Sequence, residues 1–441
     1  MTGQNGTQRQ LKATLALLDE VAKALDADIA IELWDGTRVP LGRKPDPDLT
    51  IRIADPGVIA SLLRRPGLDR IIRPYIKGLI DIKGGTLYDV GLLFAFSPSR
   101  KRLKRIPKGT ILSFLSAFLF APGVDLNAGR AFSGDESDHG KNRPKSDETE
   151  FIQFHYDVGN DFYELFLDER RLYSCAYFSD WNNSLDQAQH DKLDMICRKL
   201  RLKPGERFLD IGCGWGALIF HAAENYGVHA HGVTLSDAQL IHVREQIKAK
   251  GLEDRVSVEL KNYVDLEGPF DKIASVGMME HVGEDNLDTY CATINRLLVD
   301  KGLFLNHAIS RKAKKGQKGK NRFSSRPEQR ALQKYIFPGG ELIDLGRTIS
   351  SLERNKFEVM DVEGWREHYQ WTTKLWLDRL EANRDRAVEL VGEDVYRIWS
   401  AYLSGSSLAF LRGSARLYQV LVSKNPKGPA NLPPSRADLY R

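Results

Sequence analysis

Apolar side chains recur at two different spacings in the first 125 residues of this chain. A helical period over residues 11–25 predicts an amphipathic helix. Alternating apolar and polar positions follow it and predict two hairpins and one further strand. The hairpin signals are residues 29–41 around Asp35-Gly36 and residues 80–87 around Gly84-Gly85, and the further strand is residues 51–53. We therefore expect a small N-terminal α+β domain over residues 1–125.

The pattern changes twice after this domain. Residues 126–150 hold many small and charged residues with few large apolar ones, which predicts a flexible linker. From residue 151 to residue 441 we expect one catalytic domain, because strand-like and helix-like segments then alternate. That alternation predicts a doubly wound α/β sheet with ligands at the carboxyl ends of its strands. The expected strands are residues 208–211, 228–233, 256–260, 273–276 and 303–306.

The longest apolar stretch runs over residues 111–124 and is interrupted by Ser113, Ser116 and Pro122. It is too short to span a bilayer, which takes about 20 residues. A buried helix is favoured here. A helix lying on a membrane surface is the alternative, because a basic run directly precedes the stretch.

The amino-acid composition is that of a globular protein with more than one domain. The chain has 441 residues, of which 42% are apolar and 28% charged, as in globular proteins of two or three domains. The net charge of +5 does not demand a nucleic-acid partner. Basic residues cluster, however, in residues 100–108 and 311–322. These runs are either solvated loops or contacts to anionic lipid headgroups, where each basic residue adds about 1 kcal/mol.

The four cysteines show no C-x-x-C spacing, which argues against a zinc site or a disulfide framework. This usage fits a reducing cytoplasm. Residues 1–10 are polar and contain no signal-peptide core.

A glycine-rich segment carries the first chemical signal. Asp210, Gly212, Gly214 and Gly216 form D-x-G-x-G-x-G between the expected strand at 208–211 and a helix that begins near Ala217. Glycines let the backbone turn tightly and approach a ligand closely. Such a turn alone is a weak signal, because NAD enzymes use a similar one and it can be purely structural. The acid at the strand end resembles motif I of class I S-adenosylmethionine (SAM) methyltransferases.

Polar side chains follow the other expected strands. Thr234 and Gln239 follow the second, Tyr263 the third, Glu280 and His281 the fourth, and His307 the fifth. Many methyltransferases place an acid where this chain has Thr234. Each residue has a structural alternative: Glu280 could cap a helix, His307 could be a core histidine, and Cys175 could be a small buried hydrophobe.

Six sequence segments together point to one family of SAM-dependent enzymes. They are HYDVGNDFYELFLD, LYSCAYF, LKPGERFLDIGCGWG, GVTLS, SVGMMEHVG and KYIFPGG, in this order over residues 151–425. This set closely resembles the cyclopropane-fatty-acyl-phospholipid synthases and the related mycolic acid cyclopropane synthases. Residues 1–125 resemble, more loosely, the smaller lipid-binding domain of the phospholipid-acting members.

The resemblance implies a class I SAM-methyltransferase fold and methyl transfer from SAM to a cis double bond of a phospholipid acyl chain. Attack by the alkene leaves a carbocation, and loss of a proton from the new methyl group closes a cyclopropane ring. In this family a bound bicarbonate ion is the base. The family's bicarbonate cradle matches Cys175, Glu280, His307, Ile309 and Tyr369 of this sequence.

The SAM site carried over from the family comprises Tyr173, Ser174, Asp210, Gly212, Gly214, Gly216, Thr234, Leu235, Gln239 and Tyr263. No metal is implied. The resemblance also suggests a homodimer on the inner, cytoplasmic leaflet of a bacterial membrane. One departure is Ser406, where family members commonly have a cysteine.

Three other functions remain open at this point. The first is methylation of the same alkene to give a methylene- or methyl-branched chain. The second is a lipid-binding protein with a vestigial SAM fold, against which the intact glycine loop argues. The third is an RNA methyltransferase that uses the basic runs to hold phosphates, but the N-P-P-Y-like segment of amino-directed enzymes is missing after the fourth strand.

Overall fold

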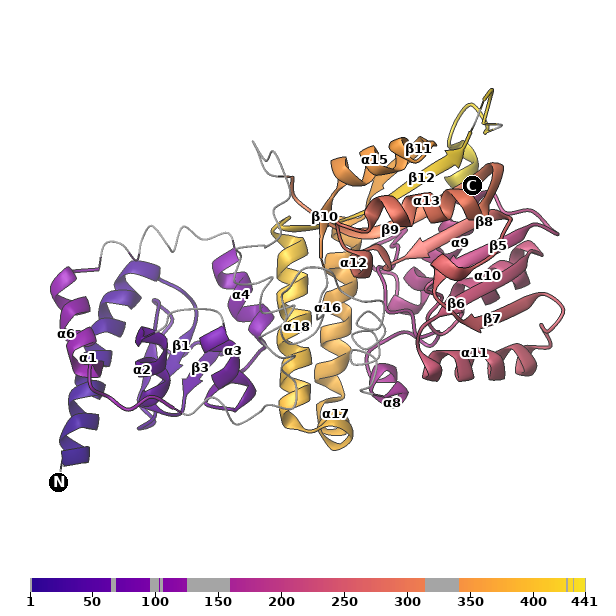
Figure 1. Cartoon of the computed structure of the whole chain (residues 1–441). Coiled ribbons are helices and arrows are strands. Elements are labelled where there is room, and N and C mark those ends of the chain that lie inside the picture. The colour runs from indigo at the N-terminus through magenta and orange to yellow at the C-terminus, as the bar shows by residue number, and fades with distance from the viewer. Residues whose placement is uncertain are drawn as a thin grey trace. The chain divides into compact units, whose positions relative to one another are not determined.

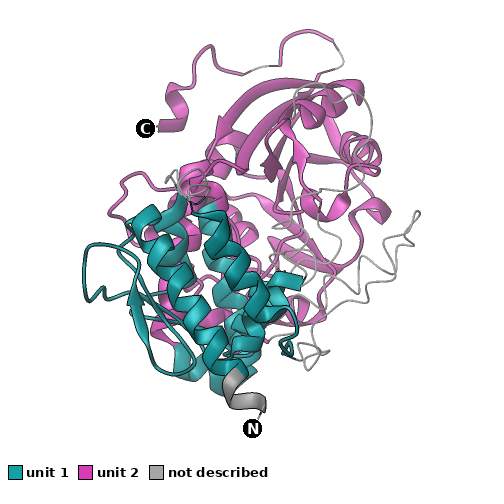
Figure 2. Ribbon diagram, turned by 90° about the vertical axis from the view of Figure 1, so that its left-hand side faces the viewer, with its two compact units in different colours: residues 1–138, 321–336, 384–408 teal, residues 139–320, 337–383, 409–441 magenta. Residues whose placement is uncertain are grey.

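The chain folds into two compact units (Figure 2). Unit 1 comprises residues 1–138, 321–336 and 384–408, and unit 2 comprises residues 139–320, 337–383 and 409–441. The structure is a computed structural model that describes residues 2–64, 69–95, 103, 106–124, 159–313, 341–425, 427–430 and 432–440. The expected linker at 126–150, the segment KYIFPGG and most of both basic runs lie outside the described residues.

Unit 1 contains a four-stranded sheet in the order β2-β1-β3-β4, accompanied by helices (Figure 1). The predicted helix at 11–25 and hairpin at 29–41 are confirmed, the latter as antiparallel β1 and β2. The elements are α1 (Thr2–Leu25), β1 (Ala30–Glu32), β2 (Arg38–Pro40), β3 (Thr50–Ile53), α2 (Pro56–Arg64), α3 (Asp69–Ile76), β4 (Ile80–Lys83), α4 (Leu87–Ala95), α6 (Lys108–Phe118), α17 (Arg384–Val391) and α18 (Glu393–Leu411), which is in unit 1 as far as residue 408.

The second predicted hairpin, over residues 80–87, is wrong. β4 is a strand, but Leu87 begins the helix α4. The Thr86 hydroxyl accepts a hydrogen bond from the backbone N–H of Tyr88 and donates to Asp89 Oδ2, which also accepts from the Thr86 N–H. These reciprocal contacts resemble a capping box and start a helix where the apolar pattern alone indicated a strand.

Helix α18 belongs to unit 1 although it lies far along the chain. Arg397 donates to Asp81 Oδ1 (3.1 Å) and to the carbonyl of Tyr75 (3.2 Å). Ala401 packs against the cluster that contains Val58, Tyr75 and Ile80. A segment almost at the end of the sequence therefore completes the N-terminal unit.

Helix α6 packs against α1 (Figure 1). It buries only one of its faces. Phe114 and Phe118 are buried beside Ile59 and Ala60, as a buried helix requires. Leu112 is 69% exposed and Leu119 is 64% exposed on the other side. We call the outward set the α6 apolar face; it consists of Ile111, Leu112, Leu115, Leu119 and Phe120, all exposed.

Unit 2 is built on an eight-stranded sheet in the order β11-β12-β9-β8-β5-β6-β7, with β10 paired to β9. Strands β5 to β9 are parallel, which confirms the doubly wound α/β prediction, while β12 runs antiparallel to both β9 and β11. The strands are β5 (Arg207–Ile211), β6 (His229–Thr234), β7 (Val256–Leu260), β8 (Phe270–Val276), β9 (Leu298–Arg311), β10 (Ile343–Asp344), β11 (Phe357–Gly364) and β12 (Ala415–Lys424).

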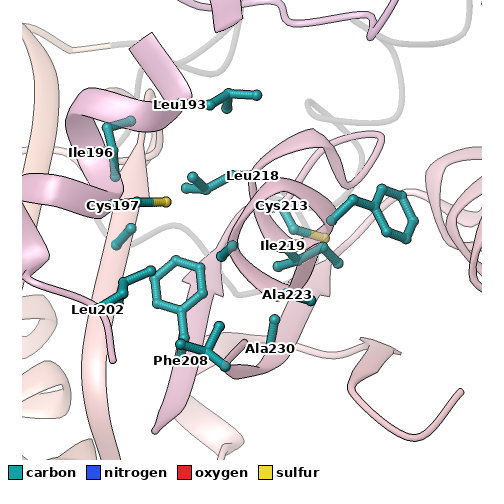
Figure 3. Close-up of a cluster of buried hydrophobic side chains, with 14 of the residues drawn as sticks. Leu193, Ile196, Cys197, Leu202, Phe208, Cys213, Leu218, Ile219, Ala223 and Ala230 are labelled. Atoms are coloured by element: carbon teal, nitrogen blue, oxygen red, sulfur yellow. The ribbon is translucent and has the colours of Figure 1, made fainter. Parts of the chain in front are cut away.

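Helices cover both faces of this sheet. On one face, α9, α10 and α11 pack on β5, β6 and β7 around Phe208 and Ile219 (Figure 3). On the other, α13 and α15 pack on β8 and β9 around Ile273 and Phe304. The helices of unit 2 are α8 (Asn160–Glu164), α9 (Leu185–Leu200), α10 (Ala217–Tyr226), α11 (Asp237–Lys250), α12 (Met279–Val282), α13 (Leu287–Leu297), α15 (Leu345–Arg354) and α16 (Arg366–Ala382), with 3₁₀ turns η3 (Tyr263–Asp265) and η4 (Ala437–Tyr440).

Strand β9 is longer than the sequence predicted. The expected strand ended at residue 306, with His307 just beyond it, and this placement is wrong. β9 continues to Arg311 because β12 pairs with it from Leu303 onward. His307 and Ile309 therefore lie within a central strand of the sheet.

In the parts of the chain that the structure describes, every helix is too short or too polar to cross a membrane.

Candidate active site

The glycine loop joins β5 to α10 at the carboxyl edge of the sheet. Gly212, Gly214 and Gly216 have φ angles of 79°, 55° and 86°, a region that other residues rarely adopt. A Cβ at Gly216 would lie 2.8 Å from the Phe220 ring, so glycine is needed there to pack α10. A Cβ at Gly214 would meet nothing within 4 Å, because that position lines an open pocket.

That pocket has an empty volume of about 600 Å³ and lies at the ends of β5, β6, β7 and β8. The expected residues that line it are Gly212, Gly214, Thr234, Leu235, Gln239 and Tyr263. His281, which the sequence places just past the fourth strand, also lines the pocket but was not assigned to the SAM site. Sequence reasoning did not identify the other lining residues. Lys261, Asn262, Gly277 and Met278 directly follow strand ends and could have been found by that rule, whereas Ile211, Val233 and Val276 belong to the strands themselves.

The pocket wall at the end of β6 is neutral. Thr234 donates its hydroxyl hydrogen to Gln239 Oε1 (2.7 Å) and accepts from the backbone N–H of Ser236 (3.1 Å). Both side chains are buried. The position that holds an acid in many methyltransferases is thus occupied by a threonine whose partner is an amide.

Tyr173 and Ser174 do not line this pocket. Lys192 of α9 donates to Ser174 Oγ (2.8 Å), and Gln189 donates to the carbonyl of Ser174 (3.0 Å). The ring of Tyr173 stacks on Trp376 with centroids 5.2 Å apart. These contacts fix the segment next to Cys175 against α9 and α16.

Two ionisable groups of opposite sign are buried in this region: Asp210 at the end of β5 and Lys192 of α9. Burial raises the pKa of Asp210 to about 7, while the charge of Lys192 counteracts this rise. Burial lowers the pKa of Lys192 to about 8, against the attraction of Asp168. Asp210 Oδ1 has no hydrogen-bond partner among the described residues.

Glu280 and Ile309 are connected by a hydrogen bond. Glu280 lies in α12, just past β8, and its Oε1 accepts the backbone N–H of Ile309 (2.7 Å). Val276 at the end of β8 is in register with His307, which shares a face of β9 with Ile309. The two neighbouring strands therefore bring Glu280 and His307 to the same end of the sheet.

Trp365 links the remaining expected residues. Its carbonyl accepts from the Cys175 thiol (3.8 Å) and from the backbone N–H of Tyr369 (3.0 Å). Its ring meets the His307 ring edge-on at 5.5 Å. Tyr369 stacks on Phe410 at 4.5 Å. Trp365 is fully buried, and sequence reasoning did not identify it.

The electrostatics of this cluster favour neutral side chains. Burial raises the pKa of Glu280 to about 7 and raises that of the Cys175 thiol. Burial also lowers the pKa of His307 well below its usual value, and the charges of Lys192 and Lys199 lower it further. Cys175 is therefore a thiol and not a nucleophilic thiolate.

Three buried atoms of the cluster have no hydrogen-bond partner among the described residues: Glu280 Oε2, His307 Nε2 and Trp365 Nε1. Leaving such groups unpaired costs about 1–3 kcal/mol each. Because native proteins pair nearly all buried polar groups with protein, water or ligand, these atoms are available to a water or a small polar ligand.

Comparison with known proteins tests the predicted resemblance. A probable fatty acid methyltransferase of Pseudomonas putida is 36% identical over 433 residues, which cover 97% of this chain and 100% of that protein. The cyclopropane-fatty-acyl-phospholipid synthase of Escherichia coli (strain K12) is 40% identical over 270 residues, which cover 61% of this chain and 66% of that protein.

Solved structures agree with these relatives. The crystal structure of mycolic acid cyclopropane synthase CmaA1, complexed with SAH and CTAB, superposes with a TM-score of 0.60 and 33% identity. The match covers 65% of this chain and 100% of that one. The family model for mycolic acid cyclopropane synthetase matches residues 143–420. The predicted resemblance is confirmed, and the chain belongs to the mycolic acid cyclopropane synthetase family.

Proposed function

We propose that this enzyme transfers a methylene group from SAM to the cis double bond of acyl chains in membrane phospholipids, forming cyclopropane fatty acids. The observation that carries the proposal is a pair of buried atoms with no hydrogen-bond partner among the described residues: Glu280 Oε2, just past β8, and His307 Nε2, within the neighbouring strand β9. The names of the relatives support SAM as the methyl donor and a lipid alkene as the acceptor.

The pocket at the glycine loop fits SAM. Its glycine backbone leaves room for a close ligand at Gly214 and Gly277, where a Cβ would meet nothing within 4 Å. Asn262 and Gln239 bring amide groups to the same pocket. When bound there, SAM would supply an electrophilic methyl group on a sulfonium.

Two glycine substitutions separate this role from folding. Gly214→Val should lower SAM affinity by roughly 10-fold or more, because the new side chain enters the pocket. The left-handed backbone at this position also costs a valine about 1–2 kcal/mol of strain. Gly216→Ala should mainly lower the melting temperature, because the Phe220 ring and the Val243 side chain, at 3.1 Å, leave no room for a Cβ. Calorimetric titration with SAM and thermal melts measure the two effects. Equal SAM affinity in Gly214→Val and wild type would contradict the assignment.

Bicarbonate fits the second cluster. Glu280 Oε2 and His307 Nε2 would hold it, with Tyr369 and the backbone near Cys175 completing the shell. The charges of Lys192 and Lys199 reach His307, so the surroundings favour an anion. When bound, bicarbonate would supply the base that removes a proton from the transferred methyl group.

The protein's own side chains would bind the ligand and exchange a proton with it. Glu280 is held by the Ile309 N–H through one oxygen, which leaves the other free to exchange a proton with the ligand. Tyr369 would face the cation on the reacting acyl chain, an aromatic contact that stabilises a cation by about 0.5–2 kcal/mol.

The membrane is the proposed source of the acyl chain. We assign the lipid-binding role to the N-terminal domain, residues 1–125, because the α6 apolar face presents five exposed apolar side chains. Soluble proteins rarely leave such a patch uncovered. The basic run at 100–108 would add attraction to anionic headgroups. A peripheral location on the inner leaflet of a bacterial membrane and a homodimer remain predictions.

Methylation without ring closure is the second candidate, favoured by the relative that matches almost the whole chain and is described as a probable fatty acid methyltransferase. It shares the SAM and alkene sites and the same carbocation. In place of ring closure, a hydride shift to the cationic carbon followed by loss of a methyl proton gives a methylene branch, and a saturated methyl branch would also need a hydride donor.

The product distinguishes the two candidates. Purified protein is incubated with SAM and vesicles of unsaturated anionic phospholipid, and the released fatty acids are analysed by mass spectrometry and proton NMR. We expect a gain of one CH₂ with upfield ring protons. Vinylic methylene protons would establish methylation without closure. Vesicles of saturated phospholipid are the control, and equal turnover of free unsaturated fatty acid would contradict the phospholipid assignment.

A further inference from the structure

A chain of buried polar contacts runs from the edge of unit 2 to His307. Glu363 of β11 forms an ion pair with Lys199 of α9. Lys199 Nζ donates to Gln419 Oε1 of β12 (2.7 Å), and Gln419 Nε2 lies 3.0 Å from His307 Nδ1. Lys199, Gln419 and His307 are each about 1% exposed.

The direction of each hydrogen bond between Lys199, Gln419 and His307 follows from the donor at its start, the Lys199 ammonium group. An ammonium group only donates, so the Gln419 atom that it contacts must be the carbonyl oxygen. The other end of the amide is then NH₂, which only donates. His307 Nδ1 must therefore accept, and it carries no hydrogen. A neutral imidazole has one N–H, which is left at Nε2.

Secondary structure and packing hold this arrangement in place. Gln419 and His307 are paired residues of antiparallel β12 and β9, so their side chains lie on the same face. The Trp365 ring contacts His307 at 5.5 Å, and Lys199 Nζ lies 5.2 Å from the centre of the same ring. The tryptophan thus closes the space around both groups.

We infer that Gln419, oriented by Lys199, is a positioning residue that holds His307 in the tautomer with hydrogen on Nε2. The effect of this tautomer on ligand binding rests on the proposed function. Nε2 is the unpartnered atom of His307, and as an N–H it offers a hydrogen bond to an anion such as bicarbonate. The opposite tautomer would turn a lone pair toward the anion and repel it.

Gln419→Glu reverses the arrangement with almost no change in size. A carboxylate only accepts, so it would draw the hydrogen of His307 to Nδ1 while still pairing with Lys199. Lys199→Met removes the group that orients the amide and should give a mixture of tautomers. Ser423→Ala is the matched control, because Ser423 is a buried polar residue of the same strand whose register partner on β9 is Leu303 and not His307.

The first measurement is the tautomer itself, by ¹⁵N NMR of histidine-labelled protein without bicarbonate, with the His307 signals assigned by their loss in His307→Gln. We expect a protonated Nε2 and a bare Nδ1 in wild type and in Ser423→Ala, and the reverse in Gln419→Glu. A protonated Nδ1 in wild type would overturn the inference without any variant.

The second measurement is titration with ¹³C-bicarbonate. Because a hydrogen bond to a charged group is worth about 1.5–3 kcal/mol, the dissociation constant should rise about 10- to 100-fold in Gln419→Glu, with SAM affinity unaltered. Unchanged bicarbonate affinity with a reversed tautomer would refute the role of Nε2. Wild-type protein with the expected tautomer but no bicarbonate binding would refute the proposed base and leave the tautomer assignment standing.

Discussion

Glu280→Ala is expected to lower turnover by about 10²- to 10⁴-fold, the usual contribution of a proton-transferring group. Glu280 is the only side chain seen to bond Ile309 in the described part of the cluster, and its second oxygen is unpartnered. Removing it takes away both the anchor and the proton acceptor of the proposed ligand. SAM affinity should change little, because Glu280 does not line the glycine-loop pocket. Turnover assays and calorimetric titration with SAM measure the two quantities, and normal turnover would rule out the bicarbonate site.

Glu280→Gln shows whether the loss of activity reflects unfolding. Burial raises the pKa of Glu280 from 4.5 to about 7, so the folded protein binds this proton more tightly than the unfolded chain. The resulting stability is complete below pH 4.5 and is lost as the pH rises through 7. Glutamine keeps the acceptor for Ile309 and does not titrate. Relative to this variant, wild type should lose about 3 kcal/mol of unfolding free energy between pH 4.5 and 8.

That comparison requires bicarbonate-free buffer and chemical denaturation at each pH. A pH-independent difference between the two proteins would show that Glu280 has the same pKa in the folded and the unfolded protein, and that the cluster is more polar than its burial indicates.

Replacing two leucines of the α6 apolar face, in Leu112→Ser/Leu119→Ser, is expected to weaken binding to anionic vesicles by about 100-fold or more. Each leucine contributes about 1.5–3 kcal/mol when it is fully removed from water. Both are already 64% or more exposed, so the fold should lose little stability. Vesicle co-sedimentation measures the binding.

The matched control is Leu260→Ser, which removes a leucine that is 44% exposed at the end of β7 in unit 2. It should bind vesicles like wild type. Equal binding by the double variant and wild type would exclude the α6 apolar face as the membrane contact. Retained turnover of detergent-dispersed lipid by the double variant would assign the loss to docking and not to chemistry.

Local signals predicted most of the elements that build the pocket. The glycine loop, the strand before it and the helix at Ala217 all follow from a short segment, because glycine and strand propensity act over neighbouring residues. Thr234 and Tyr263 also lie where the strand-end rule predicted. The error at Leu87 is local too: the Thr86–Asp89 pair is a helix-start signal that the alternation of apolar residues obscured.

The remaining features depend on contacts between distant parts of the chain. β9 extends past His307 because β12, more than 100 residues later, supplies its backbone partners. Gln419 and Lys199 meet His307 only after that pairing forms. The spacing of residues in the sequence does not predict such contacts. The α6 apolar face is a further case, since an apolar stretch does not reveal which of its residues the neighbouring helix will cover.

The placement of α18 has a consequence for the modularity of the chain. Unit 1 is discontinuous: the backbone leaves it after residue 138 and returns twice, for residues 321–336 and for residues 384–408. A fragment that begins at residue 151 would retain Arg397 and Ala401 but not the Asp81 and Tyr75 partners that they contact. The N-terminal unit is therefore not a detachable appendage, and gain or loss of that unit in evolution requires a matching change in the surface of a helix more than 200 residues away.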